Sequence, residues 1–161
     1  MRYLIFCLSL AYGGTAQALS CLPTDVAETY KNLAESETRY TLVVGKFDFD
    51  KTKLPQTDFD NQTNTPDLTE VAARFLGRSI QKNGFTKRYE RHVTLNVHCF
   101  GPWCGGIESR QPWVAFLNID GDQPTVEVTP CGGDLFPYSE ETEAQVLACF
   151  RGEPCVSKRR R

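Results

Sequence analysis

The sequence predicts a mainly β domain: a small five-stranded antiparallel barrel with a helix at each end. Two observations lead to this fold class. Five segments with the composition of β-strands lie between two helical segments, and the chain left after removal of an export signal has the length of one domain. Five strands of this length close readily into a barrel, because closure removes exposed sheet edges.

The N-terminus has the composition of an export signal. Arg2 supplies a positive charge, residues 3–12 form a short apolar run, and small residues lead up to Cys21. The run is too short to cross a bilayer, which takes roughly 20 residues. Cleavage before Leu19 and cleavage before Cys21 both fit this boundary, and lipid attachment to Cys21 is a third alternative. We therefore expect a signal peptide over residues 1–18 or 1–20 and a secreted or periplasmic protein.

The overall charge of the chain is mild. Loss of residues 1–18 leaves 143 residues and removes Arg2, so the formal net charge moves from −2 to about −3. This charge gives no reason to expect nucleic acid as a partner, or a membrane unless Cys21 carries lipid. We expect one domain over residues 21–156, followed by a basic tail over residues 157–161.

A short helix and a first strand open the mature chain. Residues 24–35 predict an amphipathic helix, because apolar side chains recur at helical spacing and Thr24 or Asp25 can cap its start. Residues 40–47 predict a strand that is apolar on both faces. Residues 50–69 are rich in Asp, Thr, Pro and Asn, which predicts a long loop.

The centre of the chain predicts two strands joined by a tight turn. The second strand begins near Glu70 and can bend at Gly77. Residues 83–84, Asn-Gly, are a turn signal, and a long strand follows over residues 86–99. Its apolar and polar side chains alternate strictly, which predicts one buried and one exposed face.

A hairpin and a second helix complete the chain. Residues 113–119 and 125–129, joined by an Asp-Gly turn, predict the clearest hairpin in the sequence. Ser139 is followed by acidic residues that favour the first turn of a helix, and this helix runs through Phe150.

Six of the seven cysteines remain after the signal, and an even count in an exported chain predicts a disulfide framework. Two pairs, with four and five residues between their members, each flank a turn that contains Gly and Pro, so both can close locally. The remaining two cysteines then close a loop of about 110 residues. The Cys-x2-Cys spacing typical of zinc sites is absent. The expected disulfides are Cys21–Cys131, Cys99–Cys104 and Cys149–Cys155.

Candidate catalytic groups are few. His92 and His98 share one face of the long strand, but six residues at about 3.3 Å each place them roughly 20 Å apart, too far to share a metal ion. His98 and Cys99 are strand neighbours and point to opposite faces, so they cannot form a dyad. No nucleophile elbow, phosphate loop or dinucleotide motif is present. We therefore expect a non-enzymatic protein with no catalytic residue, metal or cofactor.

The order of these features resembles the netrin-like module family, which includes the tissue inhibitors of metalloproteinases. The resemblance covers nearly all of the mature chain. It implies an OB-type five-stranded barrel flanked by helices, with a disulfide tying the N-terminus to the barrel. The features that carry it are Cys21 near the N-terminus, the strand over residues 40–47, the strand Val93-Thr-Leu-Asn-Val97, the hairpin over residues 113–129, Pro130-Cys131-Gly-Gly and the terminal helix.

The resemblance also implies a binding function. In the inhibitors of this family, the amino group and carbonyl of an N-terminal cysteine chelate the catalytic zinc of a protease. The matching residue here is Cys21, with Leu22 and Pro23 as the adjoining edge, although the second cysteine of the inhibitor pattern, two positions on, is absent. We expect an exported module that binds another protein, with a zinc metalloprotease as a candidate partner. The alternatives are a lipid-anchored envelope protein and a small thiol-dependent enzyme.

Overall fold

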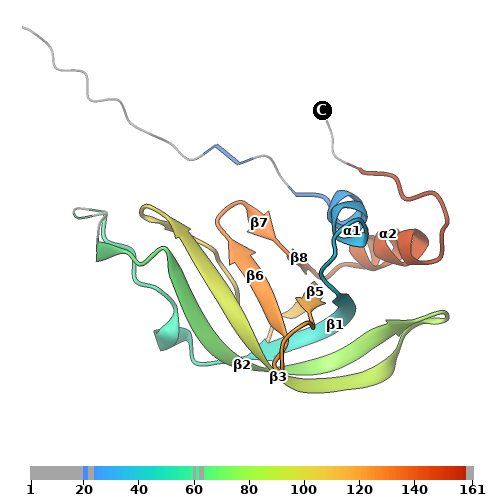
Figure 1. Cartoon of the computed structure of the whole chain (residues 1–161), viewed down its shortest axis with the longest axis horizontal. Helices are drawn as coiled ribbons and strands as arrows, with labels where there is room; N and C mark the ends of the chain where they lie inside the picture. The colour runs from blue at the N-terminus through green and yellow to red at the C-terminus, as the bar shows by residue number, and fades with distance from the viewer. Residues whose placement is uncertain (1–19, 22–23, 60, 62–63, 159–161) are drawn as a thin grey trace, which may run out of the picture.

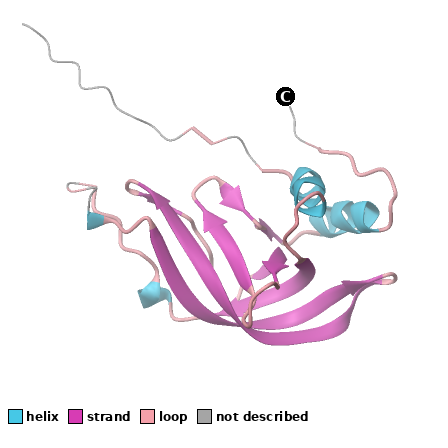
Figure 2. Ribbon diagram, in the orientation of Figure 1, coloured by secondary structure: helices cyan, strands magenta, loops and turns pink. Residues whose placement is uncertain are grey.

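The computed structural model describes residues 20–21, 24–59, 61 and 64–158 (Figure 1). The expected signal peptide, Leu22, Pro23 and residues 159–161 lie outside these ranges. Among the described residues, eight strands form one sheet and two α-helices lie together on one side of it (Figure 2). None of the described helices is long and apolar enough to cross a membrane. The mainly β class with a helix near each end is confirmed.

The elements begin and end close to the residues that the sequence predicts. Asp25 rather than Thr24 caps the first helix, Ser139 caps the second, and the loop after the first strand contains the 3-10 turn η1 (Lys51–Lys53). The elements are α1 (Val26–Ala34), β1 (Tyr40–Asp48), β2 (Leu68–Gln81), β3 (Gly84–Phe100), β4 (Trp103–Cys104), β5 (Pro112–Asn118), β6 (Thr125–Thr129), β7 (Gly132–Gly133), β8 (Leu135–Pro137) and α2 (Glu140–Phe150).

The sheet differs from the expected one in strand number and in direction. Three of its eight strands, β4, β7 and β8, have only two or three residues, too few to produce a period in the sequence. In addition, β3 and β6 pair in parallel, through Thr94–Val97 and Thr125–Val128, so the sheet is not wholly antiparallel. The prediction of five strands, all antiparallel, was therefore wrong in strand number and in strand direction.

The hydrogen-bonded pairings run in a closed circuit through five strands. β1 pairs with β2 on one side and with β5 on the other. β2 pairs with β3, β3 with β6, and β6 returns to β5. Each long strand therefore has a neighbour on both sides over at least part of its length.

The hairpin that is clearest in the sequence is the weakest link of this circuit. β5 and β6 are paired at one position only, Asn118 with Thr125. The rest of β5 pairs with β8, through Trp113–Ala115, while β6 pairs with β3 and β7. Alternating side chains identify both strands correctly, but they carry no information on which neighbour satisfies their backbone groups.

Two hydrophobic clusters explain why β1 and β5 are apolar on both faces. Val43 and Leu117 belong to a cluster drawn from all five strands of the circuit. Leu42 and Phe116, which point to the opposite face, belong to a second cluster with Val26 of α1 and Val146 of α2. The helices therefore cover the outer face of β1 and β5, as Figure 1 also indicates. Buried members of the two clusters are 0–9% exposed.

Two glycines face each other where β1 crosses β2. Gly45 and Gly77 are direct partners in the register. A Cβ atom on Gly45 would lie 2.4 Å from the Leu76 carbonyl oxygen and 2.7 Å from the Phe75 ring, and one on Gly77 would lie 2.2 Å from the Val44 carbonyl oxygen. The close approach of the two strands, with Phe75 packed over them, leaves no space for a side chain. Gly77, at which the sequence suggested a bend, is therefore needed for the close packing of β2 against β1.

We predict that Gly45→Ala and Gly77→Ala each lower the free energy of unfolding by about 1–3 kcal/mol, because a methyl group there must displace backbone atoms. Gly121→Ala is the matched control: its Cβ would meet its nearest heavy atom at 3.7 Å, an ordinary contact. Urea unfolding of the three variants measures the difference. Equal stability of all three would contradict the packing role.

Candidate functional site

The expected binding edge begins at a disulfide. Cys21 is half-buried and bonded to Cys131, with the two Cα atoms 5.1 Å apart, and Ser20 before it is exposed. Leu22 and Pro23, the other two residues of the expected edge, lie outside the described residues. The bond therefore holds the segment at Cys21 against the turn between β6 and β7.

Packing reinforces this attachment. Gly132, the first residue of β7, has φ +103°, and a Cβ atom on it would lie 2.4 Å from Thr24 Oγ1. The Thr24 side chain thus rests directly on the β7 backbone. Thr129 Oγ1 donates to the Gly132 carbonyl and closes the same turn. Thr24 therefore packs on the same turn to which the disulfide attaches Cys21.

An open groove lies beside this disulfide. Its volume is about 580 Å³. Aromatic and aliphatic side chains form much of its wall, and the Trp113 indole is fixed by donation from Nε1 to the Glu108 carbonyl at 3.2 Å. The lining residues are Cys21, Thr24, Gly106, Trp113, Val128, Thr129, Pro130, Cys131, Gly132, Leu135, Phe136 and Pro137.

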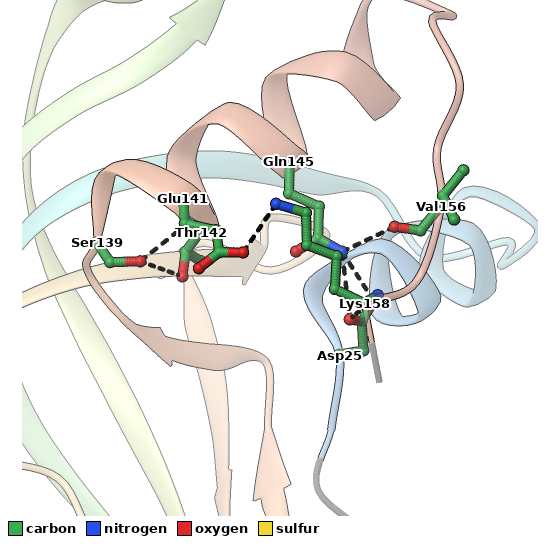
Figure 3. A network of polar contacts seen from close by, with 7 residues as sticks. All are labelled: Asp25, Ser139, Glu141, Thr142, Gln145, Val156 and Lys158. Carbon is green, nitrogen blue, oxygen red and sulfur yellow. Dashed lines mark hydrogen bonds and ion pairs between the residues drawn. The ribbon is translucent and has the colours of Figure 1, made fainter. Parts of the chain in front are cut away.

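Asp25 connects the beginning of the domain to its end (Figure 3). Its carboxylate caps α1 by accepting from Ala27 N at 2.9 Å and also accepts from the Gln145 side chain of α2 at 3.2 Å and from Lys158 N at 3.0 Å. Burial by itself would raise the pKa of Asp25, but these hydrogen bonds outweigh it and lower the pKa. A carboxylate kept charged in this way binds both terminal segments.

The C-terminal segment has further contacts of its own. Gln145 Nε2 donates to the Val156 carbonyl at 3.0 Å, and Lys158 Nζ lies 2.8 Å from Glu141 Oε1 (Figure 3). Lys158, which the sequence assigns to a basic tail, is therefore attached to the domain through both its backbone and its side chain.

A cluster of titratable groups lies on β3, β6 and the β7–β8 turn. His98 Nε2 lies 2.5 Å from Glu127 Oε2, and Asn96 Nδ2 donates to Glu127 Oε1 at 2.7 Å. Burial and the nearby Glu127 raise the pKa of Asp134 to about 6. Burial and the carboxylates of Asp134, Glu127 and Asp120 raise the pKa of Tyr40. The sequence did not reveal this cluster, because the pairing of distant strands, such as β3 with β6, brings its members together.

The two histidines have different surroundings. His92 is exposed, as expected, whereas His98 is half-buried and paired with Glu127. In the described part of the chain, no group of three or more His, Cys, Asp or Glu side chains is arranged to hold a metal ion.

All six cysteines from Cys21 onward are paired, and the pairings are those expected from their spacing. Cys99 and Cys104 are direct partners in the short β3–β4 ladder, and Cys149 and Cys155 close the end of α2. The disulfides are Cys21–Cys131, Cys99–Cys104 and Cys149–Cys155.

Comparisons of the chain with protein-family models, with curated proteins and with solved structures find no match. The fold and the site therefore define the class of the protein on their own: a mainly β, disulfide-bonded domain with a helical layer on one face.

We predict that Cys21→Ala with Cys131→Ala lowers the free energy of unfolding by about 4–5 kcal/mol, because the bond restricts a loop of 110 residues in the unfolded chain. Cys99→Ala with Cys104→Ala, which opens a loop of five residues, is the comparison and is expected to cost about 2 kcal/mol from the same effect. Guanidinium unfolding measures both. Equal losses would contradict a stabilisation governed by loop length.

We predict that Asp134→Asn stabilises the protein at neutral pH. The folded state holds the Asp134 proton more tightly than the unfolded state, so ionisation above about pH 6 disfavours folding, while below pH 3.8 the carboxyl is protonated in both states. The variant should gain about 1–2 kcal/mol near pH 8, and this gain should shrink as the pH falls from about 6 towards 4. Urea unfolding across this range tests it, and a gain independent of pH would contradict it.

Proposed function

We propose that the mature chain is an exported, netrin-like binding domain built on an OB-type barrel, and that it acts without catalysis. The closed circuit of pairings through β1, β2, β3, β6 and β5 supports the barrel, since a sheet that closes on itself needs a neighbour on both sides of each strand. Three disulfides support export, because such bonds persist in oxidising compartments.

One observation carries the proposed binding surface: the Cys21–Cys131 bond holds the start of the mature chain at the rim of the open groove. A partner that covers this rim contacts half-buried Cys21 and the apolar wall of the groove together. Apolar walls with a few polar groups are typical of binding sites, and tryptophan, here Trp113, is enriched where binding energy concentrates. Rigid attachment of both sides of the rim reduces the entropy lost on binding.

The partner class proposed for this surface is a zinc metalloprotease. If cleavage of the signal precedes Cys21, the residue has a free amine and a carbonyl next to a fixed disulfide. A neutral amine is a good ligand for zinc, and it is available only when no residue precedes it. The disulfide then fixes the position of these two ligand atoms relative to the rest of the surface.

The two alternative functions make different demands on the same residues. A thiol-dependent enzyme needs a free thiol, whereas the six cysteines after the signal are occupied in disulfides. A lipid-anchored protein needs an acylated Cys21, which leaves the sulfur unable to bond Cys131. The Cys21–Cys131 bond thus supports the binding domain over both alternatives.

We predict that the protein starting at Cys21 inhibits a zinc endopeptidase, and that the same domain with Leu19-Ser20 retained inhibits at least about tenfold less, because the added residues convert the amine into an amide. The measurement is cleavage of a fluorogenic peptide by a panel of zinc endopeptidases, with a serine protease as the control enzyme. Both forms fold around the same disulfides, so a difference between them reports on the amine. Equal inhibition, or none by either form, would overturn the proposed zinc ligation.

The intact mass of the protein exported with its own signal decides which form exists. A mass that begins at Cys21 and lies six hydrogens below the reduced value matches three disulfides and a free amine. A mass that begins at Leu19 contradicts zinc ligation through Cys21 while leaving the groove as a binding surface. A lipidated mass overturns the proposal in favour of the anchored protein.

A further inference from the structure

The β2–β3 hairpin concentrates positive charge that the net charge of the chain conceals. Residues 74–92 contain six cationic side chains and one carboxylate, a net charge of +5, in a chain whose formal net charge is −2. All six cations are exposed. In Figure 1 this hairpin extends at the lower right of the view, away from the other strands. The cations are Arg74, Arg78, Lys82, Lys87, Arg88 and Arg91, and the carboxylate is Glu90.

One edge of this hairpin is open. β3 pairs with β2 along almost its whole length. On its other side it pairs with β6 only over Thr94–Val97 and with β4 only at Cys99 and Phe100. Within the described part of the chain, residues 85–93 have no strand on that side. This open stretch spans about 30 Å, at roughly 3.3 Å per residue.

The hydrogen bonds at the far end of β3 determine which backbone groups face the open edge. Thr94 N donates to the Pro124 carbonyl at 2.9 Å and the His98 carbonyl accepts from Gly105 N at 2.8 Å, both on the side of β6 and β4. Cys99 N donates instead to the Asp67 carbonyl, on the β2 side. Alternate residues of a strand address the same side. The N–H and C=O groups of the even-numbered residues, Arg88, Glu90 and His92, therefore point to the open edge.

The side chains along this edge determine what it can accept. Lys87 and Arg91 lie on one face of the strand and Arg88 on the other, since neighbours alternate. An added strand therefore has a cation beside it whichever way its own side chains point. A second copy of the same edge would bring like charges together, which disfavours self-pairing. Residues 1–19 contain no Asp or Glu and residues 158–161 are all basic, so neither stretch supplies carboxylates for this edge.

A like-charged pair inside the hairpin supports this interpretation. Arg78 and Arg88 are direct cross-strand partners, an arrangement that destabilises a sheet. Arg88 is compensated by Glu90 at 2.7 Å, whereas Arg78 has no ion-pair partner among the described residues. Glu90 is shared with Arg74 at 3.7 Å, so the single carboxylate does not neutralise the hairpin. Carboxylates brought by a partner would relieve this repulsion.

We propose that the open edge of β3, residues 85–93, binds an extended acidic segment of another protein as an additional β-strand. Backbone hydrogen bonds to Arg88, Glu90 and His92 supply the pairing, and the cations select acidic sequences. This surface differs from the groove beside Cys21, so either one can be tested and fail without the other.

The test uses fluorescence anisotropy with a labelled peptide of about ten residues that alternates Glu and Val, at about 50 mM salt. Two control peptides separate charge from strand pairing: a Glu-Val peptide that is N-methylated at every residue keeps the charge but lacks the backbone donors on both sides, and Lys alternating with Val reverses the charge. We expect the Glu-Val peptide to bind at least about tenfold more tightly than either control. Equal binding of the N-methylated peptide overturns strand addition, and so does the absence of binding.

Variants of the full mature chain localise the site. His92→Pro removes an N–H that points to the open edge and leaves the ladder with β2 intact, because proline is tolerated where the N–H of an edge strand faces solvent. We expect it to weaken binding by at least about tenfold, whereas the control His92→Ala retains it. Lys87→Glu with Arg91→Glu should also abolish binding.

Hydrogen exchange on the unmodified protein provides a measurement independent of any variant. We expect the bound Glu-Val peptide to slow exchange of the amides of Arg88, Glu90 and His92, the three that face the open edge. Protection elsewhere, or dimerisation of the free protein through this edge, overturns the proposal.

Discussion

The burial of both faces of β1 is the constraint on which the rest of the structure depends. A strand that carries apolar side chains on both faces has to be covered on both. One face of β1 meets the cluster formed by the five strands of the pairing circuit, and the other meets the cluster beneath α1 and α2. The circuit of strands thus buries one face of β1, and the helical layer buries the other. The close contact between Gly45 and Gly77 then sets how tightly β2 lies against β1.

The helical layer also explains why the two ends of the chain lie together. α1 and α2 share the apolar cover of β1 and β5, so the segments before α1 and after α2 leave the domain near one another. Asp25 converts this proximity into hydrogen bonds with Gln145 and Lys158. The Cys21–Cys131 bond adds a covalent attachment on the strand side. A segment preceding α1 that would otherwise fray is therefore suited to form part of a binding surface.

The distribution of charge over the surface indicates a basic site that the net charge of the chain does not. A net charge of −2 argues against polyanionic partners only when the charge is spread evenly over the surface. Here the cations of residues 74–92 gather on one hairpin, where β2 and β3 run past the other strands, and acidic side chains dominate the remainder. The groove beside Cys21 and the edge of β3 consequently offer two surfaces of different chemistry, one largely apolar and one basic.

The sequence by itself determined the local features of this protein. Periodicity located α1, β1, β2, β3 and α2 to within a few residues, because each buries a face against the core and so repeats at its own period. Cysteine spacing identified the two short disulfides by proximity, and the long one by elimination. What only the tertiary structure decided is the set of neighbours. The partners of β5 and β6 and the open edge of β3 follow from pairings between distant strands, and the meeting of His98 with Glu127 follows from the parallel pairing of β3 with β6. Residues 94–97 and 125–128 lie about thirty positions apart, and no local pattern records which distant backbone will satisfy a strand's hydrogen bonds.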